Sequence, residues 1–147
     1  MVSAVGVTGA RLLGLPVRLR GIQLGRPVDL LLDLANGRAL GLDVLCGDER
    51  HRFLPLSTAT VSAAELSVAS ALMLVDGGGA FYHDRAERLR TLRGKPVEHD
   101  GSPVGVLRDV VIGTGGHIDE VVVDSDGQLS KTVSDGRLRV GGRLLRC

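Results

Sequence analysis

The sequence predicts a mainly β protein, built from two tandem small β-barrels or curled sheets joined by a short helical linker. Valine and leucine come in short runs bounded by turn residues, and 21 of the 147 residues are glycine, a pattern typical of many short strands. One motif also occurs twice, 80 residues apart. We therefore divide the chain into a first repeat (residues 10–75), a glycine-rich break with a short helical linker (residues 76–91) and a shortened second repeat (residues 92–147).

The repeated motif is visible when residues 12–29, LLGLPVRLRGIQLGRPVD, are written above residues 92–109, LRGKPVEHDGSPVGVLRD. Seven of the 18 positions are identical, where composition alone gives about one or two. We assign structural roles to the shared glycines, prolines and aspartates, which are Gly14, Pro16, Gly21, Gly25 and Asp29 in the first repeat and Gly94, Pro96, Gly101, Gly105 and Asp109 in the second.

Each motif predicts the same succession of strands. The proline opens an extended segment, because proline disfavours helix at and before its own position. Gly21 and Gly101 lie where a hairpin turn is needed. The next strand (residues 28–32 or 107–112) runs into the turn LANG or GTGG, and a third strand follows at residues 39–45 or 118–123.

The repeats differ after the third strand. The first continues into RFLPL (residues 52–56), which is strand-like. A later match, TVSAAELSV (60–68) with TVSDGRLRV (132–140), has an offset of 72, so we expect the second repeat to lack the RFLPL strand. Residues 121–123 would then form an exposed strand edge. Between the repeats, the stretch of residues 84–92 has no helix breaker and predicts a short helix ending near Gly94.

Two glycine-containing segments raise the question of ligand chemistry. The run VVIGTGG (110–116) has the form of a phosphate loop, but Ile118 stands where a dinucleotide fingerprint needs glycine, and β-branched residues follow in place of a helix. The segment DSDG (124–127) lacks the further ligands of a calcium loop. Both are interpreted as turns.

No catalytic, metal-binding or cofactor-binding residue is predicted. The four histidines have no metal-ligand spacing and no positioned nucleophile beside them. The repeated Asp29 and Asp109 could indicate metal or acid chemistry. Their place at the start of an apolar strand instead favours hydrogen bonds to turn amides.

Charge and composition restrict the partners. The net charge is +1 and only three residues are aromatic, which argues against DNA binding and general single-strand binding. A candidate partner contact is the local basic run Arg85, Arg88, Arg90, Arg93 and Lys95, which could meet an acidic protein or RNA phosphate, or form a solvated linker helix. Two cysteines, no signal peptide and no apolar span predict a cytoplasmic protein without a membrane span. The preference for arginine over lysine is typical of a high-GC bacterial genome.

The motif LRGKPV…DG…G…D (92–109) and the strand–turn–strand DLLLDLANGRALGLDV (29–44) together resemble the PRC-barrel family of small β-barrels, and RFLPL is similar to the family's next strand. Family members include the cytoplasmic domain of the photosynthetic reaction-centre H subunit and the C-terminal domain of the ribosome maturation factor, which contacts a ribosomal protein. The resemblance implies a non-enzymatic protein-binding or assembly module. We expect a homodimer or a partner protein across the exposed edge. The alternatives are a ribosome- or RNA-associated factor that uses the basic run, and a small-ligand binder or enzyme.

Overall fold

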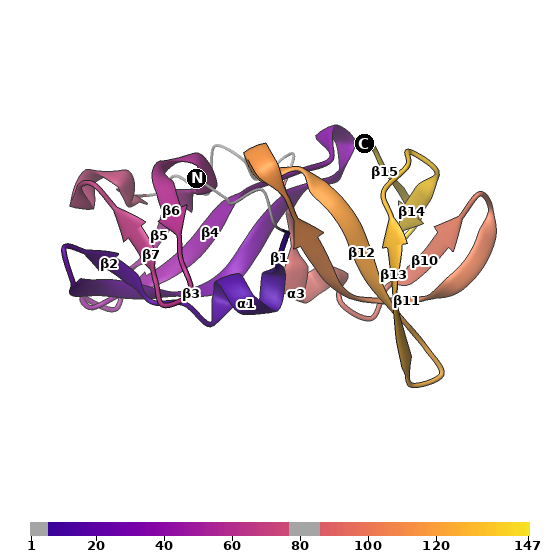
Figure 1. Cartoon of the computed structure of the whole chain (residues 1–147), viewed down its shortest axis with the longest axis horizontal. Coiled ribbons are helices and arrows are strands. Elements are labelled where there is room, and N and C mark those ends of the chain that lie inside the picture. The colour runs from indigo at the N-terminus through magenta and orange to yellow at the C-terminus, as the bar shows by residue number, and fades with distance from the viewer. Residues whose placement is uncertain (1–5, 77–85) are drawn as a thin grey trace.

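The chain forms two β-sheets that lie side by side along the long axis of the molecule (Figure 1). The computed structural model describes residues 6–76 and 86–147. Strands dominate these residues, which confirms the mainly β fold, and one of the two sheets is a curled half-barrel.

The first-repeat sheet has the strand order β6-β7-β2-β3-β4-β5-β8, with β9 added on β3. Its strands are β2 (Val17–Leu19), β3 (Ile22–Asp33), β4 (Arg38–Cys46), β5 (His51–Pro55), β6 (Ala59–Val61), β7 (Leu66–Val68), β8 (Val75–Asp76) and β9 (Glu87–Arg88). Single 3₁₀ turns, η1 (Leu34–Asn36), η2 (Leu56–Thr58) and η3 (Ala71–Met73), connect them.

The second-repeat sheet has the order β13-β12-β11-β10-β14-β15, with β1 added on β11. Its strands are β1 (Val7–Thr8), β10 (Pro96–His99), β11 (Ser102–Ile112), β12 (Ile118–Ser125), β13 (Gln128–Val133), β14 (Leu138–Val140) and β15 (Arg143–Leu145). The other elements of the described residues are the short helices α1 (Gly9–Leu13) and α3 (Leu89–Leu92) and the 3₁₀ turn η4 (Thr114–Gly116).

The repeated motif forms a matching hairpin in each sheet, as predicted. The turn between β2 and β3 has positive φ at Arg20 (49°) and Gly21 (81°), and the turn between β10 and β11 has them at Asp100 (55°) and Gly101 (82°). Two successive positive φ angles define a type I′ turn, whose twist suits antiparallel strands.

The second glycine of the motif is required by close packing between strands. A Cβ added at Gly25 would lie 2.6 Å from the carbonyl oxygen of Leu45, and one at Gly105 would lie 2.4 Å from that of Asp124. Leu45 and Asp124 are themselves 79 residues apart, at matching places in β4 and β12. The two repeats therefore need glycine here for the same steric reason.

The GTGG segment is a turn between strands, as predicted. It forms η4, and β12 follows it directly. The amide of Ile118, just beyond this turn, donates a hydrogen bond to the carbonyl oxygen of Gly37 in the corresponding turn of the first repeat (2.9 Å). The two turns thus meet, and their glycines serve chain reversal and contact between the repeats.

The two repeats exchange strands. β1, at the start of the chain, pairs with β11, so that Val7 faces Ile112 and Thr8 faces Val111. β9, which precedes the second repeat, pairs with β3, so that Glu87 faces Leu32. Val7 and Glu87 are 80 residues apart, as are Leu32 and Ile112, so the two contacts are equivalent. The exchange therefore follows an approximate twofold symmetry.

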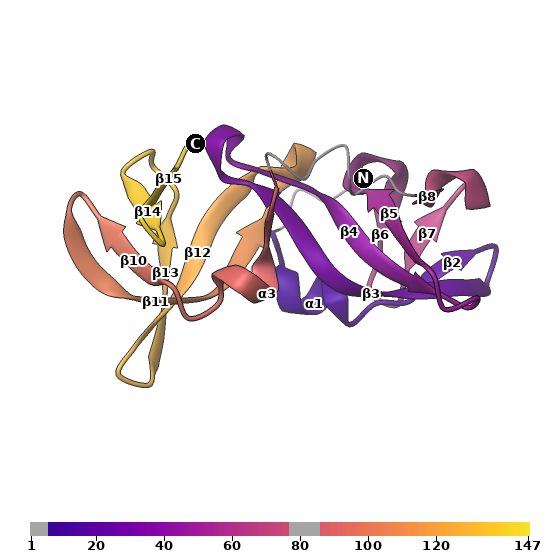
Figure 2. The ribbon, with the colours of Figure 1, turned by 180° about the vertical axis from the view of Figure 1, so that it is seen from behind.

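The exchange produces one hydrophobic core. α1 and α3 lie next to each other between the two sheets (Figure 2). Their buried residues Leu12 and Leu89 belong to the same core cluster as Leu30 of β3 and Ile112 of β11. Each sheet therefore packs on side chains supplied by the other repeat.

The helix between the repeats is shorter than predicted. α3 begins at Leu89, and Glu87–Arg88 is a strand rather than the first turn of a helix. Tertiary pairing with β3 overrides local helix propensity here. The N-terminal part of the predicted helix, including Asp84, and the glycines of the break at residues 77–79 lie outside the described residues.

The prediction that the second repeat lacks a strand equivalent to β5 is wrong. Lys131 of β13 faces Val122 of β12, as Phe53 of β5 faces Asp43 of β4. Because Val122 and Asp43 are equivalent at an offset of 79, β13 occupies the place of β5. The missing residues shorten the connections: four residues separate β4 from β5, but only two separate β12 from β13.

Two further expectations fail for the same reason. Residues 121–123 are not at an edge, because β13 covers them along their whole length. The match of residues 60–68 with 132–140 is not a structural equivalence: β7 runs parallel to β2, whereas β14 runs antiparallel to β10. The repeats are equivalent only up to β5 and β13.

Candidate functional site: the repeat junction and an open strand edge

The two motif aspartates lie buried where the repeats meet. Asp109 is 8% exposed. Its Oδ1 accepts a hydrogen bond from the amide of Val110 (2.8 Å), and its Oδ2 accepts one from the amide of Ala10 (3.1 Å). Ala10 lies in the first turn of α1, whose amides have no acceptor within the helix. Asp109 therefore caps the helix that begins the other repeat.

Asp29 makes the reciprocal contact. Its Oδ1 accepts hydrogen bonds from the amides of Leu30 (2.9 Å) and Arg90 (3.2 Å), and Arg90 lies in the first turn of α3. Sequence reasoning expected bonds to turn amides. It did not reveal that the second amide comes from the other repeat, because the exchange is a tertiary event.

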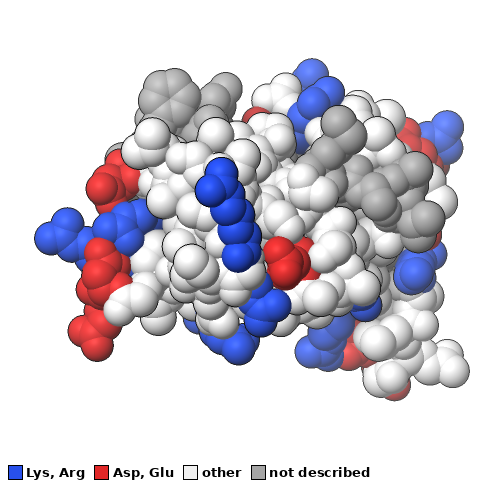
Figure 3. Space-filling model, turned by 60° about the vertical axis from the view of Figure 1, so that its left-hand side comes forward, with Lys and Arg blue, Asp and Glu red and all other residues white. Residues whose placement is uncertain are grey.

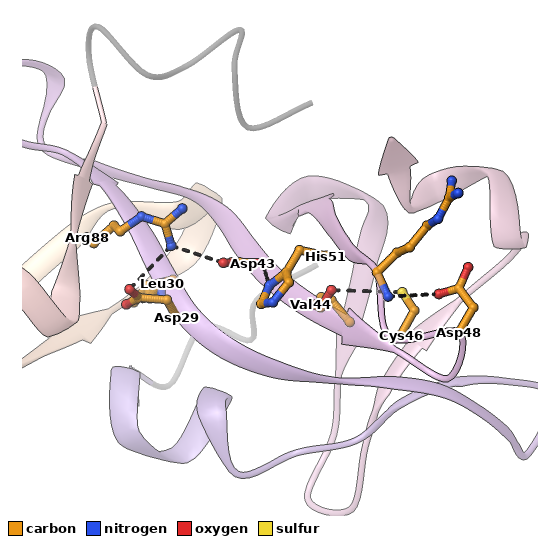
Figure 4. Close-up of polar contacts among 9 residues, drawn as sticks. Asp29, Leu30, Asp43, Val44, Cys46, Asp48, His51 and Arg88 are labelled. Atoms are coloured by element: carbon orange, nitrogen blue, oxygen red, sulfur yellow. Dashed lines mark hydrogen bonds and ion pairs between the residues drawn. The ribbon is translucent and has the colours of Figure 1, made fainter. Parts of the chain in front are cut away.

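A charged cluster surrounds Asp29 (Figure 4). The guanidinium Nη1 of Arg88 lies 3.0 Å from Oδ2 of Asp43 and 3.5 Å from Oδ2 of Asp29. Oδ1 of Asp43 in turn lies 2.9 Å from Nδ1 of His51. The hydrogen bond to Asp43, together with both negative charges, raises the pKa of Arg88 above its ordinary value. Arg88 is thus held between two carboxylates.

This cluster belongs to the first-repeat sheet alone. Thr8 stands at the position equivalent to Arg88, and Val122 at the position equivalent to Asp43. The charges are therefore an addition to the shared architecture. They fix β9 against β3 and β4, in support of the strand exchange.

The predicted basic run is divided by the structure. Arg85 lies outside the described residues, and Arg88 is engaged by the two carboxylates. Arg90, Arg93 and Lys95 are exposed, and within residues 6–76 and 86–147 none of the three forms an ion pair.

A shallow depression of about 380 Å³ lies between the two helices. Its lining residues are Ala10, Leu13, Gly14, Pro27, Val28, Arg90 and Arg93. The two guanidinium groups have no ion-pair partner among the described residues, although Nε of Arg93 donates a hydrogen bond to the carbonyl oxygen of Arg108 (3.2 Å), and together they can accept an anionic group. On the side that carries β2 and β7, Figure 3 shows basic and acidic side chains interspersed among the visible described residues.

Sequence reasoning missed the outer edge of β13. In the described part of the chain, β13 pairs only with β12. Leu129 and Val133 are 62% and 63% exposed, although both are large apolar residues in a strand. The β12–β13 hairpin extends away from the body of the molecule (Figure 1, lower right). The sequence signal was present: the Asp-Gly turn at residues 126–127 precedes the segment QLSKTV (128–133), which has apolar residues at 129 and 133 and threonine at 132.

The hydrogen-bonding pattern shows which backbone groups of β13 point outward. The two-residue turn pairs Ser125 with Gln128, and the amide of Ser134 donates to the carbonyl oxygen of Asp119 (2.9 Å). In an antiparallel ladder, hydrogen-bonded pairs alternate with non-hydrogen-bonded pairs. The even-numbered residues of β13 thus bond to β12. The amide and carbonyl groups of residues 129, 131 and 133 face away from it.

The equivalent edge in the first repeat is covered. β8 pairs with β5 there, so that Val75 faces Phe53 and Asp76 faces Arg52. The Asp76 carboxylate accepts a hydrogen bond from Nε of Arg52 (2.8 Å). Of these two equivalent strands, β5 has a short strand added at its outer edge, whereas β13 has none among the described residues.

The chain matches no protein-family model and no curated protein sequence. Among the described residues, no three His, Cys, Asp or Glu side chains are grouped so that they could hold a metal ion. No helix within those residues is long and apolar enough to cross a membrane.

Proposed function

We propose that this chain is a non-catalytic, PRC-barrel-like protein-binding and assembly module that engages an extended protein segment along the outer edge of β13. One observation carries the proposal: the backbone amide and carbonyl groups of residues 129, 131 and 133 face outward from β13, and the side chains of Leu129 and Val133 are exposed, whereas the equivalent strand β5 is covered by β8. Exposed strand edges with apolar side chains pair readily with other chains. Addition of a strand to a sheet edge is a general mode of peptide recognition.

A single proline substitution in β13 tests this function. Proline at residue 131 removes an outward-facing amide hydrogen while the bonds between β12 and β13 stay intact, because residue 131 does not bond to β12. Peptides selected from a random display library on the wild-type protein should still bind Lys131→Ala and should lose binding to Lys131→Pro. Lys131→Ala is the matched control, since it loses the same side chain but keeps the amide.

The result that would overturn the proposal is equally direct. If the selected peptides bind Lys131→Pro as well as they bind Lys131→Ala, then the edge of β13 is not the binding surface. The circular dichroism spectra of the two variants should match, which shows that the hairpin is intact in both.

Arg90 and Arg93 of the inter-helix depression have no acidic partner among the described residues, which favours a second candidate function, contact with ribosomal RNA. Arg90 and Arg93 would then neutralise phosphates, and binding would weaken as salt rises. The double variant Arg90→Ala/Arg93→Ala should lose salt-sensitive co-sedimentation with ribosomal particles, whereas Arg139→Ala, at an exposed arginine of β14, should keep it. Co-sedimentation that does not depend on salt would contradict this candidate.

A further inference from the structure

Resting on the proposed function, we infer the chemistry of the segment that β13 accepts: an antiparallel strand with the alternating pattern apolar–x–acidic–x–apolar. Its acidic residue lies opposite Lys131, and its apolar residues lie opposite Leu129 and Val133. Three observations support this pattern: the side chains on one face of β13, the charge of Lys131, which has no ion-pair partner among the described residues, and the strand that covers β5.

The side chains that define the pattern share one face of the sheet. In the ladder with β12, Leu129 faces Asp124, Lys131 faces Val122, and Val133 faces Glu120. Successive side chains alternate between the faces of a strand, so these odd-numbered residues of β13 project together. A strand added outside β13 would place every second residue directly beside them.

Lys131 supplies the charge specificity. It forms no ion pair among the described residues. Directly opposite residues of opposite charge stabilise an antiparallel pair, and like charges destabilise it. An acidic residue opposite Lys131 is therefore preferred, and a basic residue is disfavoured. The flanking Leu129 and Val133 favour apolar partners for the same geometric reason.

The first repeat contains a strand addition of this kind. β8 runs antiparallel to β5, sets an apolar residue against Phe53 and sets the carboxylate of Asp76 against Arg52. The chain thus already uses a short segment with apolar and acidic residues to cover the edge equivalent to that of β13. Phe53 is the residue equivalent to Lys131, so this precedent supports the addition of an antiparallel strand with apolar and acidic side chains, whereas the position of the acidic residue follows from Lys131 itself.

A second copy of the chain fits the edge less well. In the antiparallel register that pairs the outward-facing positions of two copies, residue 129 lies opposite residue 133 and Lys131 faces its own counterpart, so two like charges would lie directly opposite each other. Lysine in the middle of an edge strand is a common device against self-association. We therefore assign the edge to another protein's extended segment, and the homodimer expected from the sequence becomes an outcome of the test.

The test uses the full chain and a matched pair of synthetic peptides. One carries Val-Thr-Glu-Thr-Val and the other Val-Thr-Lys-Thr-Val, both with the same polar flanks. In nuclear magnetic resonance titrations, the Glu peptide should bind wild type roughly three- to tenfold more tightly than the Lys peptide. Lys131→Glu should reverse this preference, and Lys131→Pro should bind neither peptide.

The outcomes separate the failure of this inference from failure of the proposed function. Equal binding of both peptides by wild type, lost in Lys131→Pro, would overturn the acidic preference and leave the edge as the binding surface. A wild-type dimer that dissociates in Lys131→Pro and binds neither peptide would place a second copy there instead. A monomer that binds neither peptide, with fast hydrogen exchange at the amides of residues 129, 131 and 133, would overturn both.

Discussion

At the scale of single residues, the junction depends on two buried carboxylates. Asp29 and Asp109 each bond to one amide of their own strand and to one first-turn amide of the other repeat's helix. A buried carboxylate without such donors would be strongly destabilising. The aspartates recur in the sequence because each holds the opposite repeat in place.

We expect Asp109→Ala to lower the free energy of unfolding by about 2 kcal/mol, because the buried amide of Val110 and the partly buried first-turn amide of Ala10 lose their acceptor. Asp109→Asn keeps one side-chain oxygen and should cost less than the alanine variant. Urea denaturation of both variants measures the difference. A change within about 0.5 kcal/mol for Asp109→Ala, as at an ordinary surface site, would contradict this role.

Acid should disrupt the ion pair that supports the first-repeat edge. Arg52 donates two hydrogen bonds to the Asp48 carboxylate (3.0 and 2.7 Å) and lowers the pKa of Asp48 from 3.8 to about 2. Because the folded-state pKa is the lower one, this pair stabilises the fold above pH 3.8, and the contribution is lost as pH falls toward 2. In a carbon-13 titration of carboxyl groups, the pKa of Asp48 should be about 2 in wild type and should rise toward its ordinary value in Arg52→Gln, where the amide of Arg50 still lowers it. An unchanged midpoint in the variant would show that Arg52 does not set this pKa.

At the scale of elements, the sequence predicts strands and turns well and their partners poorly. The strands on either side of LANG and GTGG follow from local patterns, since valine and leucine runs end at turn residues. The pairing of Glu87–Arg88 with β3 does not follow from local patterns, because nothing within residues 84–92 indicates a partner strand 55 residues earlier in the chain. The open edge was misplaced for a related reason: the closest sequence match for residues 132–140 lies in β6 and β7, whereas the hairpin turn at residues 126–127 places β13 where β5 lies in the other repeat.

The first hairpin turn carries a residue poorly suited to its backbone. Arg20 has a φ of 49°, where the equivalent turn has Asp100. Asparagine and aspartate tolerate this left-handed conformation better than arginine does. We expect Arg20→Asn to raise the free energy of unfolding by roughly 0.5 kcal/mol. Thermal unfolding measures this shift, with Arg26→Asn, at an exposed strand position of negative φ, as the control that should not gain stability.

At the scale of the whole molecule, the repeats form one intertwined body rather than two barrels on a string. β1 is added to the second-repeat sheet and β9 to the first-repeat sheet, α1 and α3 pack between the sheets, and one core cluster spans both. The exchange places the junction at the centre of the molecule, while the hairpin of β12 and β13 projects from it. The outer edge of β13 therefore lies away from the junction between the repeats.

This exchange predicts that the halves fold only together. A fragment of residues 1–78 would lack β9 and α3, which pair with and pack on β3, and a fragment of residues 79–147 would lack β1 and α1. Each fragment alone should give the narrow proton chemical-shift dispersion of an unfolded chain. Their equimolar mixture should recover the dispersed spectrum of the intact protein. Carrying Asp109→Ala in the second fragment should weaken the complex, since the carboxylate that caps α1 is then missing. A dispersed spectrum from either fragment alone would show instead that each repeat holds its own core, and that the exchanged strands are only a surface contact.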